Sequence, residues 1–180
     1  MIEVPRRRRF VPAVRIRPVA PGDADALRNF YAGLSPESRY RRLMSMGARI
    51  GESDARRFCG ADHDHREGFV AVVDRAALSS DGPAIVGHIC LEPCEPGAVE
   101  MAVAVADRFQ GRGIGRSLTN AALDWAEHHG IARLRASMLT DNAGIVRLLQ
   151  SLRRPVTFST PVGGVIEAVV QVSAGPARAA

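Results

Sequence analysis

Residues 107–116 (DRFQGRGIGR) combine three glycines at alternating positions with three arginines, directly before a stretch with helical periodicity. Glycine lets the backbone turn sharply, so that successive N–H groups converge on one point. The start of the following helix adds unpaired N–H groups and the positive end of its dipole. Arg112 and Arg116 add mobile positive charge. The segment therefore predicts a cradle for a pyrophosphate group.

Two common phosphate-binding loops do not match this spacing. The pattern Gly111-x-Gly113-x-Gly115 differs from G-x-G-x-x-G because its third glycine comes one residue early. The segment follows the fourth expected strand instead of opening a βαβ unit, which argues against a dinucleotide-binding fold. A P-loop requires a lysine, and the sequence contains none.

The stretch resembles instead the signature Q/R-x-x-G-x-G/A, which follows the fourth strand in the GNAT superfamily of acyl-CoA-dependent N-acetyltransferases. Here it reads Gln110-x-x-Gly113-x-Gly115, and the similarity covers about residues 14–152. Residues 14–43 and 62–73 are similar to GNAT domains of bacterial protein acetyltransferases that modify acetyl-CoA synthetase. The resemblance implies an α/β fold with a single mixed, mostly antiparallel sheet of about six to seven strands, flanked by about four helices.

The resemblance also implies a reaction and a binding site for acetyl-CoA as co-substrate. In this family an amine attacks the thioester carbonyl directly, so a base must deprotonate the ammonium and a backbone N–H must stabilise the oxyanion. By family alignment, the pantetheine arm contacts backbone groups of Val103, Ala104 and Val105. The pyrophosphate is held by Gln110, Gly111, Arg112, Gly113, Ile114, Gly115 and Arg116. Asn142 matches an Asn that contacts the cofactor, although its place before a helix equally predicts an N-cap.

Glu100 is the candidate general base. It opens the fourth expected strand, where many family members carry their catalytic Glu. Strand alternation places Glu100, Ala102 and Ala104 on one face and Met101 and Val103 on the other, so small side chains beside the carboxylate leave room for a ligand. A bulge that is usual in the family would shift this alternation after Ala104. The alternative interpretation is an exposed Glu at the start of a strand.

This sequence departs from the family at two places, at the usual general acid and just after it. Many members carry a Tyr as general acid seven residues after the Asn, where this sequence has Leu149, and the usual Gly-Phe that follows is replaced by Arg153-Arg154. The sequence therefore predicts acetyl transfer to a primary amine, by resemblance a protein lysine, with no general acid assigned. Two alternatives stay open: a small-molecule amine acetyltransferase, and a catalytically silent acyl-CoA-binding or sensor module.

The hydrophobic periodicity predicts the elements that position these residues. Alternating or continuous apolar runs predict strands over residues 14–19, 68–74, 84–91, 99–106, 131–139, 155–160 and 165–172, the second to fourth of which form an antiparallel meander. Helical spacing predicts helices over residues 23–34, 35–44 and 115–130, another after residue 142 and a short one near residues 54–59.

Charge and composition set the remaining expectations. The 180 residues carry 24 arginines and 19 acids, a net charge of +5. The first 17 residues hold six arginines and one acid, while residues 18–180 hold equal numbers of both, which weakens any prediction of nucleic-acid binding. We expect a flexible Arg-rich arm over residues 1–12, a GNAT domain over residues 13–173 and a flexible tail over residues 174–180.

The same composition favours a cytoplasmic protein. No apolar run approaches the ~20 residues of a membrane span, and three cysteines are too few for a disulfide scaffold. We expect a monomer or homodimer that binds no membrane. The motif His63-x-His65 predicts a solvated loop and no metal site, because it lacks a ligand at helical spacing. The run Arg39-Tyr40-Arg41-Arg42 could touch substrate or a 3′-phosphate, but its pattern predicts a solvated helix face.

Overall fold

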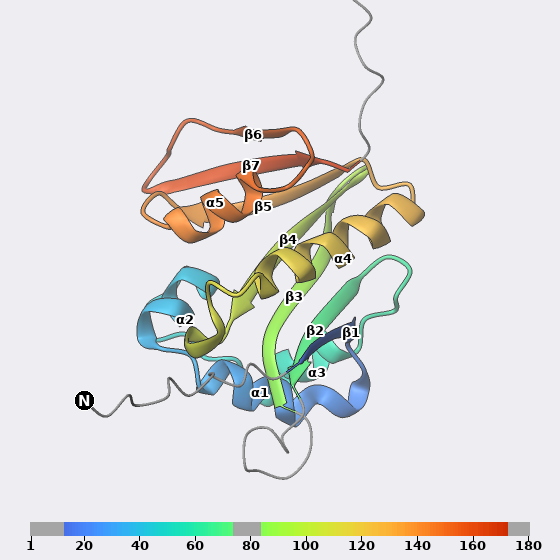
Figure 1. Ribbon diagram of the computed structural model, residues 1–180, viewed down its shortest axis with the longest axis vertical. Coiled ribbons are helices and arrows are strands. Elements are labelled where there is room, and N and C mark those ends of the chain that lie inside the picture. Colours follow the sequence, from blue (N-terminus) through green and yellow to red (C-terminus); the bar gives the residue numbers. More distant parts are fainter. Residues whose placement is uncertain (1–12, 74–83, 173–180) are drawn as a thin grey trace, which may run out of the picture.

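The computed structural model describes residues 13–73 and 84–172, so the expected arm and tail lie outside the described residues. The described chain forms one seven-stranded sheet with five α-helices (Figure 1). The strands are β1 (Val14–Pro18), β2 (Glu67–Val73), β3 (Ala84–Glu95), β4 (Ala98–Val105), β5 (Arg133–Leu139), β6 (Val156–Phe158) and β7 (Val165–Gln171). The helices are α1 (Ala24–Ala32), α2 (Pro36–Leu43), α3 (Glu52–Cys59), α4 (Ile114–His128) and α5 (Ala143–Gln150), with 3₁₀ turns at Pro21–Asp23 and Asp107–Phe109.

The sheet is mixed and mostly antiparallel, as the sequence predicts. Its strand order is β1-β2-β3-β4-β5-β7-β6, and β4 with β5 is the parallel pair. The pairing of β2 with β3 and of β3 with β4 confirms the predicted meander. The five helices are those that the helical spacing predicts, one more than the about four that the resemblance implies.

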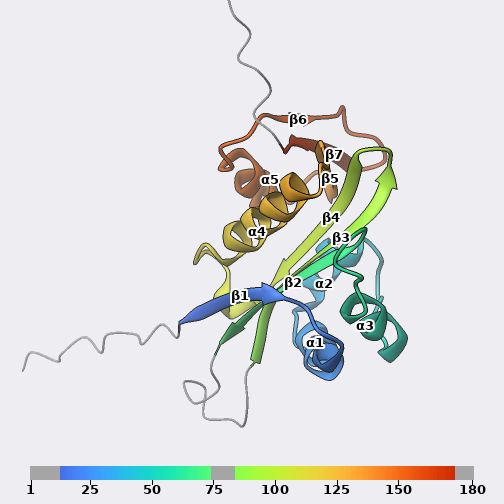
Figure 2. The ribbon, with the colours of Figure 1, turned by 90° about the vertical axis from the view of Figure 1, so that its right-hand side faces the viewer.

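Helices cover both faces of the sheet (Figure 2). Leu27 and Tyr31 of α1 belong to one buried apolar cluster, and Leu118 and Trp125 of α4 belong to a second on the opposite face. These clusters fix the two helical layers against the strands that carry the candidate site. Among residues 13–73 and 84–172, no helix has the length and apolar character that a bilayer crossing requires.

Strand β4 parts from β5 immediately after Glu100. The two strands pair only at Ala98, Val99 and Glu100, which face Arg133, Leu134 and Arg135 within the described sheet. Strand β5 stays paired with β7 up to Leu139, so it follows β7 while β4 follows β3 (Figure 1). The main-chain edge of β4 beyond Glu100 is therefore open to a ligand on the β5 side.

The predicted alternation holds in the first half of β4. Val99 and Met101 are 3% and 2% exposed, whereas the side chain of Glu100 is exposed on the other face. The prediction of a bulge after Ala104 is wrong, because the register with β3 runs unbroken from Val99 to Val105. The register between β3 and β4 shifts near Pro93, at the other end of the hairpin. The later residues of β4 are half-buried on both faces because the sheet opens there.

The close approach of β3 to α4 depends on Gly87. A Cβ at this position would lie 3.0 Å from Leu118 Cδ1, 3.2 Å from Ile114 Cγ2 and 3.3 Å from the Ala71 Cβ. We expect Gly87→Val to lower the free energy of unfolding by about 3 kcal/mol, because the core around it must shift. Urea unfolding measures the change. Gly22→Val, at a position where an added Cβ would have no described atom within 4 Å, should cost less than about 1 kcal/mol, and an equal loss in both variants would contradict the packing argument.

Candidate functional site

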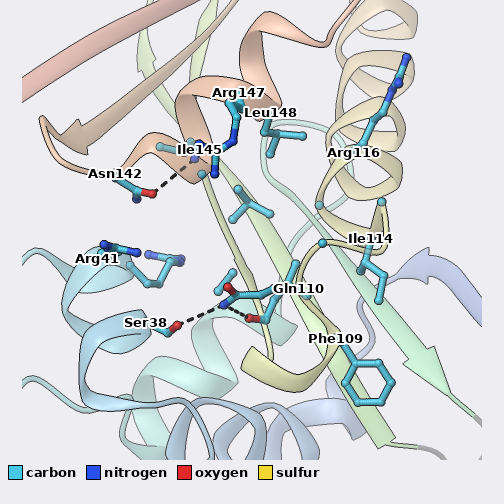
Figure 3. Close-up of a pocket in the computed structure, with 18 of the residues that line it drawn as sticks. Ser38, Arg41, Phe109, Gln110, Ile114, Arg116, Asn142, Ile145, Arg147 and Leu148 are labelled. Carbon is cyan, nitrogen blue, oxygen red and sulfur yellow. Dashed lines mark hydrogen bonds between the residues drawn. The ribbon is translucent and has the colours of Figure 1, made fainter. Parts of the chain in front are cut away.

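The split between β4 and β5 opens into a cavity of about 510 Å³ (Figure 3). Strand β4, the glycine turn, the start of α4, and the helices α2 and α5 surround it. The structure brings ten of the predicted cofactor residues to its wall: Val103, Ala104, Val105, Gln110, Gly111, Gly113, Ile114, Gly115, Arg116 and Asn142. The glycine motif and Asn142, which are distant in the sequence, thus line the same cavity.

The start of α4 presents unpaired backbone N–H groups to this cavity. Gly111 and Gly113 have φ angles of +70° and +80°, a left-handed conformation that favours glycine. Gly113 is the N-cap and offers no side-chain cap, and the first turn of α4 carries no acid. The N–H groups of Ile114, Gly115 and Arg116 therefore lack intrahelical partners and add to the positive end of the dipole. These features fit a pyrophosphate.

The two arginines of the turn have different positions. Arg116 lines the cavity, but Figure 3 shows its side chain running along α4 toward the later turns of the helix, away from Gln110. Arg112 is absent from the wall, and its guanidinium lies 5.3 Å from the centre of the Phe109 ring. The turn therefore presents backbone N–H groups to the cavity more directly than it presents arginine charge.

A polar cluster around Asp107 joins the glycine turn to α2. Its carboxylate accepts hydrogen bonds from the Ser35 N–H at 3.0 Å and from the Ser35 and Ser38 hydroxyls at 2.7 Å. The Gln110 amide donates to Ser38 Oγ and to the Val105 carbonyl, both at 3.1 Å (Figure 3). Partial burial raises the pKa of Asp107, but these hydrogen bonds outweigh it and hold the pKa below its ordinary value. The Asp107 cluster therefore fixes the start of α2 beside the glycine turn.

We expect Asp107→Asn to destabilise the fold by about 1 kcal/mol at neutral pH, because it weakens charge-assisted hydrogen bonds at a solvent-facing position. The pKa of Asp107 is lower in the folded chain than in the unfolded one, so its contribution is present above the unfolded pKa and lost as the pH falls through the folded value. Urea unfolding of both proteins at neutral and acid pH should show the difference shrinking in acid. Asp25→Asn, on an exposed carboxylate, is the control; a difference that stays constant with pH would contradict this account.

Asn142 performs the structural task that its position predicts and also borders the cavity. Its side-chain oxygen accepts a hydrogen bond from the Ile145 N–H at 3.4 Å, which caps α5, and Figure 3 shows this contact beside the open space. The sequence reasoning missed the rest of the α5 wall, which consists of Gly144, Ile145, Arg147, Leu148 and Ser151. Four of these recur at i, i+3, i+4 and i+7, the spacing of one helix face, so the signal was present.

Helix α2 contributes a second wall, which its charge pattern had predicted to face solvent. Ser38, Arg41 and Arg42 line the cavity from successive turns. Arg41 pairs with Glu37 at 2.7 Å on the rim. The interpretation of a solvated helix face is wrong for Arg42, whose Nε is sealed from solvent.

Glu100 lies outside this cavity, at the point where the two strands part. It lines a smaller cavity of about 220 Å³ together with Cys94, Arg135, Ser137 and Glu167. The Ser137 hydroxyl donates to Glu100 Oε1 at 3.2 Å and orients the carboxylate. Arg135 pairs with Glu167 at 2.7 Å and with Glu95 at 3.0 Å, so Glu100 is left as an exposed carboxylate without an arginine partner among the described residues.

The family's usual position for a general acid carries no acid here. Leu149 is fully buried in the core, and the neighbouring Leu148 is the residue that faces the cavity. The motif around His63 also supplies no chemistry to the site. His63 Nδ1 contacts Glu67 Oε1 at 2.8 Å, and in the part of the chain that the structure describes no three His, Cys, Asp or Glu side chains group as metal ligands.

A mixed sheet that splits between two parallel strands, with a glycine turn and an open helix N-terminus beside the split, fits the class of acetyl-CoA-dependent N-acetyltransferases that the glycine motif indicates. The chain belongs to the Acetyltransferase (GNAT) family, whose model matches residues 28–152. This family match agrees with the resemblance that the glycine motif carries.

One curated relative and two solved structures are similar to the chain. It is 33% identical over 138 residues to the acetyltransferase Pat of Mycolicibacterium smegmatis, a match that covers 76% of this chain but only 40% of that protein. The GNAT domain of S. lividans PAT superposes with a TM-score of 0.75 at 24% identity, over 88% of this chain and 90% of that one. YncA of Salmonella typhimurium, solved with acetyl-CoA, gives a TM-score of 0.65 at 19% identity, over 93% and 99% of the two chains.

Proposed function

We propose that this chain transfers the acetyl group of acetyl-CoA to the ε-amino group of a protein lysine, with Glu100 as general base. The observation that carries the proposal is the place of Glu100, exposed at the last residue pair before β4 and β5 separate. The similarity to Pat supports a protein acceptor, since 76% of this chain matches that acetyltransferase at 33% identity.

The residues divide the work along the split. The N–H groups at the start of α4 hold the pyrophosphate, and the open edge of β4 at Val103 to Val105 binds the pantetheine arm. Bound acetyl-CoA supplies an activated thioester. Glu100 takes the ammonium proton, directly or through water, while Ser137 keeps its carboxylate oriented. A backbone N–H of β4 stabilises the negative charge on the carbonyl oxygen during attack.

A small amine is the competing acceptor, because the cavity of about 220 Å³ beside Glu100 also contains the Glu167 carboxylate. Glu167 is paired with Arg135, but the carboxylate of Glu100 would attract an ammonium group on a small molecule as well as on a lysine. The two functions differ in the acceptor that gives the higher kcat/KM.

The test incubates the chain with acetyl-CoA and either lysine peptides or small polyamines, and follows free thiol and acetylated product by mass spectrometry. Since the chain contains no lysine, every ε-acetyl group found belongs to the acceptor. Peptide ε-acetylation is the expected result. Turnover of polyamines alone would establish the competing function, and acetyl-CoA binding without any turnover would show a silent binding module.

A further inference from the structure

The guanidinium of Arg42 has unusual surroundings for a charged group. It lies 5.7 Å from the centre of the Tyr31 ring and 5.9 Å from that of Phe58, and its Nη2 donates to Cys90 Sγ at 3.1 Å. Its Nε is buried and has no hydrogen-bond partner among the described residues. The side chain also lines the large cavity.

None of the groups packed on Arg42 neutralises it. Burial raises the pKa of Tyr31 to about 12 and also raises that of the Cys90 thiol, so both are uncharged at neutral pH. Burial lowers the pKa of His88, whose Nδ1 lies 2.9 Å from the Tyr31 hydroxyl, to about 3, so this ring is neutral too. An arginine stays protonated in proteins, so this cluster carries one positive charge.

The nearest carboxylates by sequence and register are already paired. Glu37 on the same helix binds Arg41 at 2.7 Å, and Glu92 on the same face of β3 binds Arg66 at 2.8 Å and Arg57 at 3.2 Å. Across residues 13–73 and 84–172, no carboxylate lies within ion-pair distance of Arg42. Two aromatic faces offset part of the cost of burying its charge. A buried charge normally has an anionic partner, and the open side of this one faces a ligand cavity.

The position along the split separates this charge from the phosphate end. Cys90 faces Ala102 across the β3–β4 ladder and donates to its carbonyl at 3.8 Å. Ala102 lies two residues from Glu100, about 7 Å along the strand. Ser38, one turn before Arg42 on α2, instead contacts Gln110 of the glycine turn at 3.1 Å. Arg42 therefore lies at the acyl-transfer end of the cavity.

We propose that Arg42 binds a carboxylate that one of the two reactants carries close to the transferred carbonyl. The carboxylate belongs either to the far end of a short dicarboxylic acyl group on CoA or to the acceptor beside its amine. Both sources present the same planar anion, which a guanidinium binds through two parallel hydrogen bonds. The inference rests on the proposed acyl transfer for its location, but the binding of a donor can be measured without any transfer.

The experiment uses two matched pairs of ligands and the variant Arg42→Met. Succinyl-CoA and butyryl-CoA are compared by calorimetric binding without acceptor. A lysine peptide with a neighbouring Glu and its Gln counterpart are compared by kcat/KM with acetyl-CoA. We expect the wild type to prefer the charged member of one pair by about tenfold or more, and the ratio between charged and uncharged members to fall to within about twofold of one in Arg42→Met. The pair that responds identifies the source of the carboxylate.

Equal affinities of the wild type for the two acyl-CoAs, together with equal kcat/KM values for the two peptides, would overturn the proposal without any variant. A preference that survives in Arg42→Met would overturn it as well. Arg28→Met removes an arginine paired with Asp25 on α1 and should leave both preferences intact. Removal of an uncompensated buried charge should leave the melting temperature of Arg42→Met equal to or above that of the wild type, as a purely structural role would not. If no acceptor is turned over but succinyl-CoA binding still depends on Arg42, the proposed function fails and this inference stands.

Discussion

Glu100→Gln is expected to lower kcat with acetyl-CoA and a lysine peptide by about 10² or more, because it removes a base without changing the size of the side chain. The Ser137 hydroxyl can still donate to the amide oxygen, so the orientation of the side chain is preserved. Initial rates at saturating concentrations of both reactants, measured over a pH series, give the effect on the chemical step. Calorimetric affinity for acetyl-CoA should change less than about twofold, since Glu100 lies outside the large cavity.

Glu52→Gln provides the matched control, because it removes an exposed carboxylate on α3 that pairs with Arg56. Its turnover should equal that of the wild type. Unchanged kcat in Glu100→Gln under saturating, pH-matched conditions would remove Glu100 from the mechanism. A comparable loss of affinity for acetyl-CoA would show instead that Glu100 helps to shape the donor site.

Gly115→Glu is expected to weaken binding of acetyl-CoA roughly 10²-fold, because it places a carboxylate in the proposed pyrophosphate site and like charges in contact cost several kcal/mol. The substitution should not harm the fold. A Cβ at this position would lie 3.5 Å from Leu148 Cδ2 and 3.8 Å from Val105 Cγ2, which are ordinary contacts. Glu is also a better helix former than Gly, and an acid suits the first turn of a helix. Calorimetry and thermal unfolding together separate lost binding from lost structure.

Gly22→Glu adds the same charge at a distance from the cavity and should leave the affinity for acetyl-CoA unchanged. A salt series tests the cause, since a purely electrostatic loss of affinity in Gly115→Glu should shrink as ionic strength rises. Unchanged affinity for acetyl-CoA in Gly115→Glu would show that the phosphates bind elsewhere. A lowered melting temperature would show that the loss of affinity comes from damage to the fold.

The parts of the site that depend on local sequence were predictable. Glycines with positive φ at positions 111 and 113, followed by an amphipathic helix, define their own geometry, so the turn and α4 follow from residues close together in the chain. The same holds for Asn142, whose capping role is fixed by the residue three positions later. The alternation around Glu100 also sufficed to separate a core face from an exposed one.

The parts that depend on packing between distant segments were not predictable. Nothing local in β4 indicates that its pairing with β5 stops at Glu100, because that depends on β5 following β7. The charged helix α2 looked solvated because its partner surface, the cavity wall around Arg42, is built by strands more than 40 residues later. Arg112, which the resemblance assigns to the pyrophosphate, lies outside the cavity wall, with its guanidinium 5.3 Å from the centre of the Phe109 ring.

The three residue pairs between β4 and β5 have a consequence for cohesion of the sheet. They are the only hydrogen-bonded ladder of the described chain that joins the block β1-β2-β3-β4 to the block β5-β7-β6. A ligand that contacts β4 and α4 on one side and α5 on the other links these two blocks. The free energy of unfolding should therefore rise by RT ln(1 + [L]/Kd), where [L] is the concentration of free acetyl-CoA and Kd its dissociation constant. The two blocks of the sheet should separate most easily when the concentration of acetyl-CoA is low.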